Sequence, residues 1–373
     1  MDLIGQFFSY VVPFLIILSV VVFVHEYGHY WVARRNGVKV EVFSIGFGRE
    51  LFGIDDRHGT RWKFSLIPLG GYVKMLGDAD ATSATADTAT SADPDSFPAK
   101  TVWQRMAVVF AGPAANFLFA VLVLSLLFVF SGRPFSPAVV AEVRDGSPAA
   151  EAGLIAGDRI VAVDGDEIAS FEDLQNVVRG QAEVPLTFAV LRDGERFETV
   201  VTPALEEIED RFGNVHRIGL IGISSNTIEF QTSDPASAVG QALTETGRMV
   251  TGTLAALGEM IAGSRGTEEL GGPLRIAQMS GEIAQDGLVP AIWFTAILSI
   301  NLGLINLFPI PMLDGGHLVL YAIEAARGRP LTERSQEIAF RFGLAMVLSL
   351  MVFATWNDLR HLKVIEYVSN LIS

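Results

Sequence analysis

The chain has 373 residues, of which 50% are hydrophobic and only 18% are charged, and its formal net charge at pH 7 is −15. This hydrophobic share is too high for an ordinary soluble enzyme and indicates a membrane protein with several spans. The absence of cysteine excludes a disulfide scaffold, a thiolate zinc site and a cysteine nucleophile, and the acidic balance argues against nucleic acid as a partner.

Four apolar stretches could cross a bilayer as helices. The two middle stretches are uncharged for 27 residues each, whereas a helix needs about 20 residues to cross about 30 Å of hydrocarbon. The first stretch is too long for a signal-peptide core and runs directly into Arg34 and Arg35, so we expect it to stay in the mature protein. The fourth is shorter, and we expect its helix to begin before Arg341. The stretches cover residues 7–33, 106–132, 287–313 and 342–357.

Lysine and arginine residues predict the orientation of these spans. Residues 34–105 carry ten of them, the residues before the first span carry none, and the loop after the third span carries three. The positive-inside rule therefore predicts that the N-terminus and residues 133–286 lie outside, and that residues 34–105 and 327–341 lie in the cytoplasm. The C-terminal flank, with its own basic residues, fits this orientation less well.

The connecting segments differ in composition. Residues 38–76 alternate apolar and polar residues with glycines between them, which predicts short strands and turns in a small sheet against the membrane. Residues 79–96 use only Ala, Asp, Thr, Ser and Pro, which indicates a disordered acidic loop. Residues 233–263 have a weak amphipathic pattern, typical of a helix on the outer membrane face.

Residues 138–204 have the pattern of a soluble module. Its phrase SPAAEAGLIAGDRIVAVDG resembles a PDZ domain, a fold that takes an extended peptide as an added strand. A simple spacer domain is the alternative. The expected elements are strands at 138–143 and 161–163, helices at 149–152 and 171–178, and two strands joined by Asp193-Gly194.

His25, Glu26 and His29 form an H-E-x-x-H motif inside the first apolar stretch. Residues four apart share one face of a helix, so both imidazoles can reach one metal ion. Glu26 is then placed to act on a water molecule that the metal activates. Such groups are costly in hydrocarbon unless they are paired or bind something, which favours a functional site over structural histidines.

A zinc site of this kind needs a third protein ligand and leaves the fourth position to water. Asp314 is the candidate because it ends the third uncharged run, at the same expected cytoplasmic end as the histidine pair. His317, which follows Gly315 and Gly316, is the alternative ligand. Two neutral imidazoles, one carboxylate and Zn²⁺ give a net charge of about +1, which acidifies water toward a pKa of about 7.

Other chemistries fit the embedded residues less well. An intramembrane aspartyl protease needs two Asp residues within spans, and Asp314 stands alone; a serine enzyme needs an embedded base, but the embedded histidines already fit a metal site. A metal transporter would spread polar groups along a path through several spans. An inactive PDZ adaptor would have no reason to keep both the histidine motif and Asp314.

The chain resembles the site-two protease family of intramembrane zinc metalloproteases, and within it the bacterial proteases of the sigma-E stress response. The resemblance covers nearly the whole chain in order. The matching phrases are HEYGH at 25–29, FSIGFGRELFG at 43–53, IPLGGYVKMLGD at 67–78, AGPAANF at 111–117, GGPLRIAQMSG at 271–281 and NLGLINLFPIPMLDGGH at 301–317.

The resemblance implies a role for each of several residues. By it, His25, His29 and Asp314 are the zinc ligands and Glu26 is the general base. The family's substrate-binding residues fall on Asn301 and Asn306 and on a membrane-dipping β element, Gly46-Phe47-Gly48.

Physical reasoning supports a β element near the metal. A transmembrane helix hides its peptide bonds, so a protease must unwind it and hold it extended, for example beside an edge strand. The alternative for Gly46 and Gly48 is a plain turn. The alternative for Asn306 is an interhelical hydrogen bond, and we interpret Asn116 as structural in that sense.

The resemblance also implies a biological setting. It predicts an endopeptidase of the bacterial inner membrane, with its active site near the cytoplasmic side, that cleaves single-pass membrane proteins within or beside their transmembrane segments. The implied substrates are an anti-sigma factor already trimmed by another protease, and remnant signal peptides. Relatives in enteric bacteria carry tandem PDZ domains, but residues 133–230 have room for only one. A periplasmic PDZ domain could exclude intact ectodomains by size, the option we prefer, or bind a new C-terminus.

The predicted fold is an α-helical polytopic membrane protein with about four transmembrane helices, a membrane-associated β element and one inserted periplasmic PDZ domain of the α+β class. The predicted order is helix 1 with H-E-x-x-H at 1–36, the cytoplasmic β region at 37–78, the disordered loop at 79–100, helix 2 at 101–132, the PDZ domain at 133–230, a periplasmic or interfacial helical region at 231–286, helix 3 with the LDGG motif at 287–326, and a loop with helix 4 at 327–373.

Overall fold

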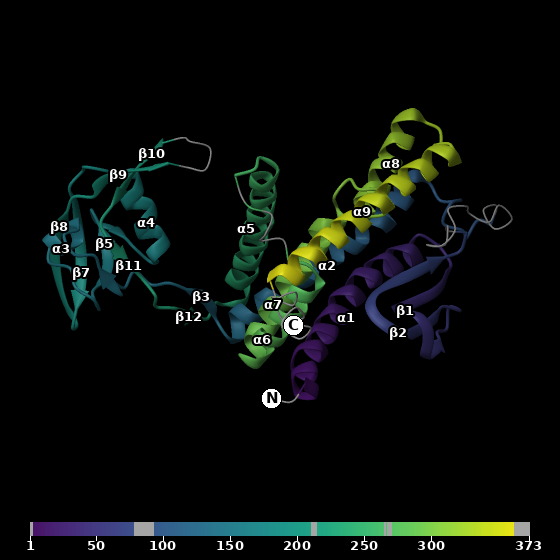
Figure 1. Ribbon diagram of the computed structural model, residues 1–373, viewed down its shortest axis with the longest axis horizontal. Coiled ribbons are helices and arrows are strands. Elements are labelled where there is room, and N and C mark those ends of the chain that lie inside the picture. Colours follow the sequence, from purple (N-terminus) through teal and green to yellow (C-terminus); the bar gives the residue numbers. More distant parts are fainter. Residues whose placement is uncertain (1–2, 78–92, 210–214, 265, 267–270, 362–373) are drawn as a thin grey trace, which may run out of the picture. The chain divides into compact units, whose positions relative to one another are not determined.

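The computed structural model describes residues 3–77, 93–209, 215–264, 266 and 271–361 (Figure 1). The chain divides into two compact units. Unit 1 comprises residues 1–126, 236–257 and 266–373, and unit 2 comprises residues 127–235 and 258–265. The helices of the predicted spans lie mainly in unit 1.

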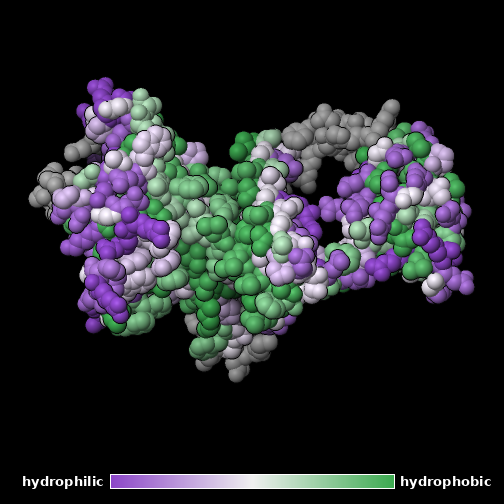
Figure 2. All heavy atoms as spheres, turned by 180° about the vertical axis from the view of Figure 1, so that it is seen from behind, coloured by the Kyte–Doolittle hydropathy of each residue, from purple (hydrophilic) through white to green (hydrophobic). Residues whose placement is uncertain are grey.

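Within the described residues, four helices are long and apolar enough to cross a membrane, which confirms the prediction of a polytopic membrane protein. Figure 2 shows apolar side chains crowded over this helical part of the molecule. The fourth helix begins before Arg341, as its composition predicted. The four are α1 (Leu3–Arg35), α2 (Val102–Phe130), α7 (Leu288–Asn306) and α9 (Glu333–His361).

The region 287–326, predicted to hold the third transmembrane helix and the LDGG motif, contains a break. Helix α7 ends at Asn306, and a separate helix α8 spans Asp314–Arg327. Pro309 and Pro311 lie between them, and proline removes a backbone donor and disfavours helix in the residue before it. Asp314 therefore begins a helix instead of ending one.

Two long strands, β1 (Val40–Asp55) and β2 (Arg61–Met75), form an antiparallel hairpin beside α1 (Figure 1). We expected short strands, but β1 bends so that residues 42–45 pair with both 71–74 and 61–64. Gly46 lies at the bend with a φ of 89°, where a Cβ would come within 2.8 Å of the Ile67 carbonyl oxygen. The hairpin packs on α1 and α2 through a buried cluster that includes Tyr30, Phe43 and Val108.

Residues 79–92 of the predicted disordered loop lie outside the described residues. Residues 93–100 of the same prediction are ordered. The Lys39 N–H donates to the Asp95 carbonyl, and the Phe97 N–H donates to the Leu76 carbonyl, both at 2.9 Å. Ser96 and Phe97 are buried, so the end of the loop belongs to the packed base of the hairpin.

The predicted interfacial region contains two helices, α5 (Pro235–Ile261) and α6 (Pro273–Gln285). Helix α6 packs on α1, and Gly281 allows close contact with Tyr10. The buried carboxylate of Asp358 in α9 accepts hydrogen bonds from the backbone N–H groups of Gly272, Leu274 and Arg275 at 2.8, 3.0 and 3.2 Å. A carboxylate at this position satisfies the free donors at the start of α6 and complements its dipole.

Unit 2 contains a four-stranded antiparallel sheet with strand order β6-β5-β7-β8. Its core includes Ile160, Leu174 and Phe188. The predicted helices and the strands around Asp193-Gly194 are present, but the strand expected at 138–143 is reduced to β4. The elements are β3 (Arg133–Phe135), β4 (Glu142–Val143), α3 (Pro148–Glu151), β5 (Arg159–Val163), β6 (Asp166–Glu167), α4 (Phe171–Gly180), β7 (Leu186–Arg192), β8 (Glu195–Val201), β9 (Ala204–Glu209), β10 (Val215–Leu220), β11 (Ile223–Ser224) and β12 (Glu229–Gln231).

One ion pair ties the loop before β5 to the end of β7. Asp158 is fully buried and accepts hydrogen bonds from Arg192 at 2.6 and 2.8 Å and from the Ile155 N–H at 2.8 Å. Burial is the largest influence on the Asp158 pKa and raises it, but these hydrogen bonds and the charge of Arg192 outweigh burial, so the pKa is lowered. Because the folded pKa lies below the unfolded value of about 4, the pair contributes stability that is present above about pH 4 and lost as the pH falls.

Arg192→Met should destabilise unit 2 by about 2–4 kcal/mol, because it leaves a buried carboxylate with a single backbone donor. This is less than for a fully buried pair, since the Arg192 side chain is 32% exposed. Amide hydrogen exchange of β5 and β7 in the full chain measures the change. Arg144→Met is the control, because its 3.9 Å contact with Glu206 is exposed and should contribute at most about 1 kcal/mol. Equal effects of the two variants would contradict the role of Asp158.

Candidate metal centre

Helix α1 positions the histidine motif. His25 and His29 are one turn apart and both are buried, and their Nε2 atoms lie 3.3 Å from each other. Glu26 occupies the neighbouring position and is half-buried. The helix therefore holds two imidazole nitrogens at one point with a carboxylate beside them, as the four-residue spacing predicted.

Asp314, the first residue of α8, meets this pair. Its Oδ2 lies 3.1 Å from His25 Nε2 and 3.5 Å from His29 Nε2. One ligand atom of each residue lies within 4.8 Å of the others, and this is a group that could hold a metal ion. The break between α7 and α8 makes the meeting possible: Gly315 and Gly316 contact the backbone of Leu307 and Ile310, and a Cβ at either glycine would overlap it.

The donor set fits zinc. Asp314 Oδ2 is buried and makes no hydrogen bond of good geometry with the described residues, although two imidazole nitrogens face it. A buried carboxylate oxygen without a donor is costly, and a cation shared with the two nitrogens removes that cost. Two histidines and one carboxylate form a three-ligand set that leaves the fourth zinc position open, as in catalytic zinc sites.

One face of α2 supports the histidines. His29 Nδ1 lies 2.9 Å from the Val108 carbonyl oxygen, so Nδ1 carries a proton and donates, and Nε2 keeps a lone pair for the metal. Four residues further along the helix, Gly112 leaves the space that the His29 ring fills. After another four residues, the Asn116 side chain lies 3.2 Å from His25 Nδ1.

The hairpin lies over Glu26. A Cβ at Gly71 of β2 would come within 3.0 Å of Glu26 Cγ and within 2.8 Å of Val22 on α1. Gly28 makes a similarly close contact between α1 and the backbone of Ala111 on α2. Sequence reasoning missed the roles of Gly28, Gly71 and Gly112. For Gly28 and Gly112, the available signal was the enrichment of small residues where helices pack closely in membranes.

The predicted substrate residues lie at different distances from the metal centre. Asn306 Nδ2 is 3.5 Å from His25 Nε2, whereas Asn301 contacts the hydroxyl of Thr253 at 3.4 Å. Gly46, Phe47 and Gly48 form the bend of β1. There the Phe47 ring is 44% exposed and stacks on Tyr72.

His317, the alternative ligand, packs its ring near two aromatic side chains. Its ring centroid is 6.3 Å from that of Tyr321 and 5.2 Å from that of Phe340. It is not a member of the metal-binding group among the described residues.

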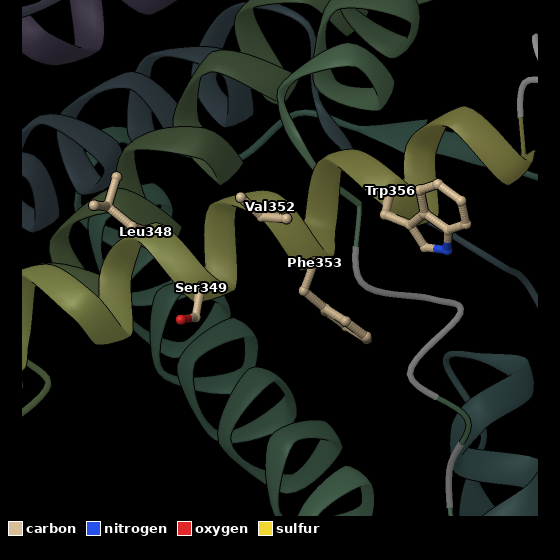
Figure 3. A pocket seen from close by; sticks show the side chains of 5 residues that line it. All are labelled: Leu348, Ser349, Val352, Phe353 and Trp356. Atoms are coloured by element: carbon tan, nitrogen blue, oxygen red, sulfur yellow. The ribbon is translucent and has the colours of Figure 1, made fainter.

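A separate hollow runs along α9, and Figure 3 shows its side chains in a row on that helix. It has no metal ligand and no charged group, and the one hydroxyl, of Ser349, donates to the Ala345 carbonyl at 2.7 Å within the helix. The lining residues of the hollow are Leu348, Ser349, Val352, Phe353 and Trp356.

Comparisons with solved structures find PDZ domains that match about a quarter of this chain. A PDZ domain of an SdrC-like protein from Listeria monocytogenes is 20% identical, with a TM-score of 0.20, and covers 25% of this chain and 90% of its own. The corresponding domain from Listeria innocua is 21% identical, also with a TM-score of 0.20, and covers 26% of this chain and 100% of its own. Scores of this size carry no argument about the fold, so the PDZ assignment stays a prediction.

Comparisons of the whole sequence match most of the chain. The family model described as Peptidase family M50 matches residues 13–350. A protein of Agrobacterium fabrum named as a zinc metalloprotease is 47% identical over 96% of this chain and 97% of its own. The metalloprotease MmpA of Caulobacter vibrioides is 38% identical over 98% of this chain and 99% of its own. The chain therefore belongs to peptidase family M50 and is a zinc metalloprotease of the site-two type.

Proposed function

We propose that this chain is an endopeptidase that cleaves single-pass membrane proteins within or beside their transmembrane segments. The observation that carries the proposal is the meeting of His25, His29 and Asp314, with Glu26 beside them, among helices apolar enough to span a membrane. A hydrolytic site in such a setting is useful only for substrates that reach it through the lipid.

His25, His29 and Asp314 would hold the zinc ion, and Glu26 would act as general base. Zinc supplies polarisation of the scissile carbonyl and a lower pKa for the attacking water. Glu26 takes the proton from that water and returns it to the leaving amine. The buried position of the two histidines excludes bulk solvent from the side of α1 and α2.

The bent hairpin is the element that would hold the substrate extended. Gly71 brings β2 against Glu26, so a peptide added to this sheet would pass close to the base. Gly46, Phe47 and Gly48 form the bend of the partner strand, and Asn306 places an amide beside His25. We assign these four residues to substrate contact. Asn301, whose recorded partner is Thr253, is assigned there only by the family resemblance.

The proposed location rests on the predicted orientation of the spans, and the proposed substrate class rests on the family resemblance. The basic residues of 34–105 predict that this segment is cytoplasmic and that the N-terminus and unit 2 are periplasmic, in a bacterial inner membrane. Candidate substrates are a trimmed anti-sigma factor, as in the sigma-E response, and remnant signal peptides. Both would present a short ectodomain on the periplasmic side.

The proposal is tested by cleavage of a tagged single-span substrate by the purified full chain in detergent. We expect cleavage to stop when a zinc chelator is added and to return when zinc is restored. A soluble, unfolded peptide with the same scissile sequence is the matched substrate, and it distinguishes loss of zinc chemistry from loss of membrane substrate binding. Cleavage that persists after complete zinc removal would exclude the proposed site.

Asp314→Asn should weaken zinc binding by more than the 10–100-fold that is typical for loss of an outer-shell partner, because it removes a ligand's charge. Zinc content after dialysis against a chelator measures the effect. Asp56→Asn is a control outside the spans. Asp56 accepts hydrogen bonds from Tyr30, Trp62 and the Thr60 N–H, which together outweigh burial and hold its pKa at about 2. Unchanged zinc content in Asp314→Asn would remove Asp314 from the ligand set.

Unit 2 is proposed to act as a PDZ-type size filter for substrate ectodomains. Strand β3 pairs with β12, register Phe135 with Glu229, so the ends of the inserted segment are close together. Replacing residues 137–227 by a short glycine-serine linker should therefore leave the helices intact. We expect the excised protein to cleave substrates with intact ectodomains that the full chain rejects. Loss of all cleavage in a folded excision variant would contradict a filter role.

A further inference from the structure

Asn116 of α2 is fully buried, and it contacts residues of α1 and α7. Its Nδ2 lies 3.2 Å from His25 Nδ1, and its Oδ1 is buried with no hydrogen-bond partner in the part of the chain that the structure describes. Helix α7 packs closely against Asn116. Ser299 of α7 donates to the Asn116 carbonyl at 3.0 Å, and a Cβ at Gly303 would lie 3.3 Å from Asn116 Cβ. An amide fixed here acts on His25 and on little else.

The direction of the contact determines whether His25 can bind a metal. If Nδ2 donates to Nδ1, then Nδ1 has no proton of its own, and the proton of a neutral imidazole sits on Nε2. Nε2 is the atom that faces Asp314 Oδ2 at 3.1 Å and His29 Nε2 at 3.3 Å, and a protonated nitrogen cannot be a ligand. His29 has the opposite and productive arrangement, because its Nδ1 faces a backbone carbonyl, which can only accept.

A half-turn of the Asn116 amide about its Cβ–Cγ bond resolves the conflict. The oxygen and nitrogen of an amide occupy nearly the same volume, and their assignment follows from the hydrogen bonds they make. After the half-turn, Oδ1 accepts from His25 Nδ1–H and the lone pair of Nε2 is free. In each orientation of the amide, one of its two polar atoms is unpaired, so hydrogen bonding alone does not favour either. Metal binding favours the orientation after the half-turn, because only there does His25 Nε2 have a free lone pair.

We propose that Asn116 is a positioning residue whose amide oxygen accepts the Nδ1 proton of His25 and so keeps Nε2 available to the metal. Asn116 and Val108 then serve the two histidines in the same way, from positions eight residues apart on one face of α2. The inference rests on the proposed zinc site. It changes the interpretation of Asn116 from an interhelical contact to an outer-shell partner of the metal.

The experiment measures zinc affinity in the full chain carrying Glu26→Gln, by competition with a chromophoric chelator in detergent, so that activity plays no part. Asn116→Leu has similar volume but no acceptor, and we expect it to bind zinc about 10–100-fold more weakly. Asn116→Asp supplies only acceptor oxygens, and we expect it to bind at least as tightly as the parent. Ser125→Ala is the control, because Ser125 is buried on the same helix and its hydroxyl donates to the Val121 carbonyl within that helix.

The outcomes are distinct. A structural role would lower the thermal stability of the metal-free Asn116→Leu protein and leave its zinc affinity equal to that of the parent, which would overturn the inference. Should Asn116→Leu fail to fold, Asn116→Asp decides: weak zinc binding there would show that the amide donates, and parental or tighter binding supports the acceptor. A Glu26→Gln parent that binds no zinc would instead overturn the proposed metal site itself.

Discussion

Glu26→Gln should abolish cleavage of a single-span substrate while zinc stays bound. The amide has the shape of the carboxylate but cannot take a proton from water, and loss of a general base typically lowers the rate by about 10²–10⁴-fold. The three proposed ligands are untouched, because Glu26 is not a member of the metal-binding group. Rate and zinc content are measured on the same preparation, since only a loss of rate at constant zinc identifies a base.

A matched substitution separates this role from a general effect of charge. Glu41 lies on β1 of the hairpin and contacts Lys74 at 3.6 Å, with both side chains partly exposed. Glu41→Gln removes one negative charge from the same sheet that covers Glu26, and we expect full activity. If Glu26→Gln keeps appreciable turnover, another group is the base. If it loses zinc, Glu26 has a structural role in the site.

The sequence was sufficient to predict the spans and to bring together the three proposed ligands. Long uncharged runs predict membrane helices from the cost of burying charge, and the four-residue spacing of His25 and His29 needs only helix geometry. Asp314 was selected by its depth at the end of a span. In the structure, Asp314 reaches the histidines as the first residue of a new helix, α8, which follows two prolines. The prolines were visible in the sequence and should have ended the helix at Asn306.

The groups that support the site were beyond the sequence. Val108, Gly112 and Asn116 act on His25 and His29 from about 80 positions away along the chain, and nothing local in α2 says which of its faces meets α1. A glycine or an asparagine in an apolar helix has several structural explanations. Only the packing of the two helices shows that these three residues, each four apart, line the histidine pair.

Gly112→Ala tests this packing, and we expect it to abolish zinc binding. The added methyl group would overlap His29 Nε2, the proposed ligand atom, and would come within 2.5 Å of Cε1 and 2.9 Å of Cδ2. The ring cannot retreat easily, because it is buried and its Nδ1 is held at 2.9 Å by the Val108 carbonyl. The substitution itself favours helix, since alanine is a better helix former than glycine by about 1 kcal/mol. A loss of zinc therefore reflects displacement of the ligand and not a weaker α2.

Gly252→Ala is the control, because a Cβ at Gly252 in α5 meets nothing within 4 Å. It should bind zinc as the parent does and be more stable by up to about 1 kcal/mol. Both proteins are compared by zinc content after dialysis, by thermal unfolding without metal and by cleavage rate. The expected pattern is a folded Gly112→Ala protein without zinc and without activity. Full zinc content in that variant would mean either that His29 Nε2 moves away from the methyl group and still binds zinc, or that His29 is not a ligand. The zinc content of a Gly112→Ala, His29→Ala double variant separates these two cases. If His29 is a ligand, the double variant should bind less zinc than Gly112→Ala alone.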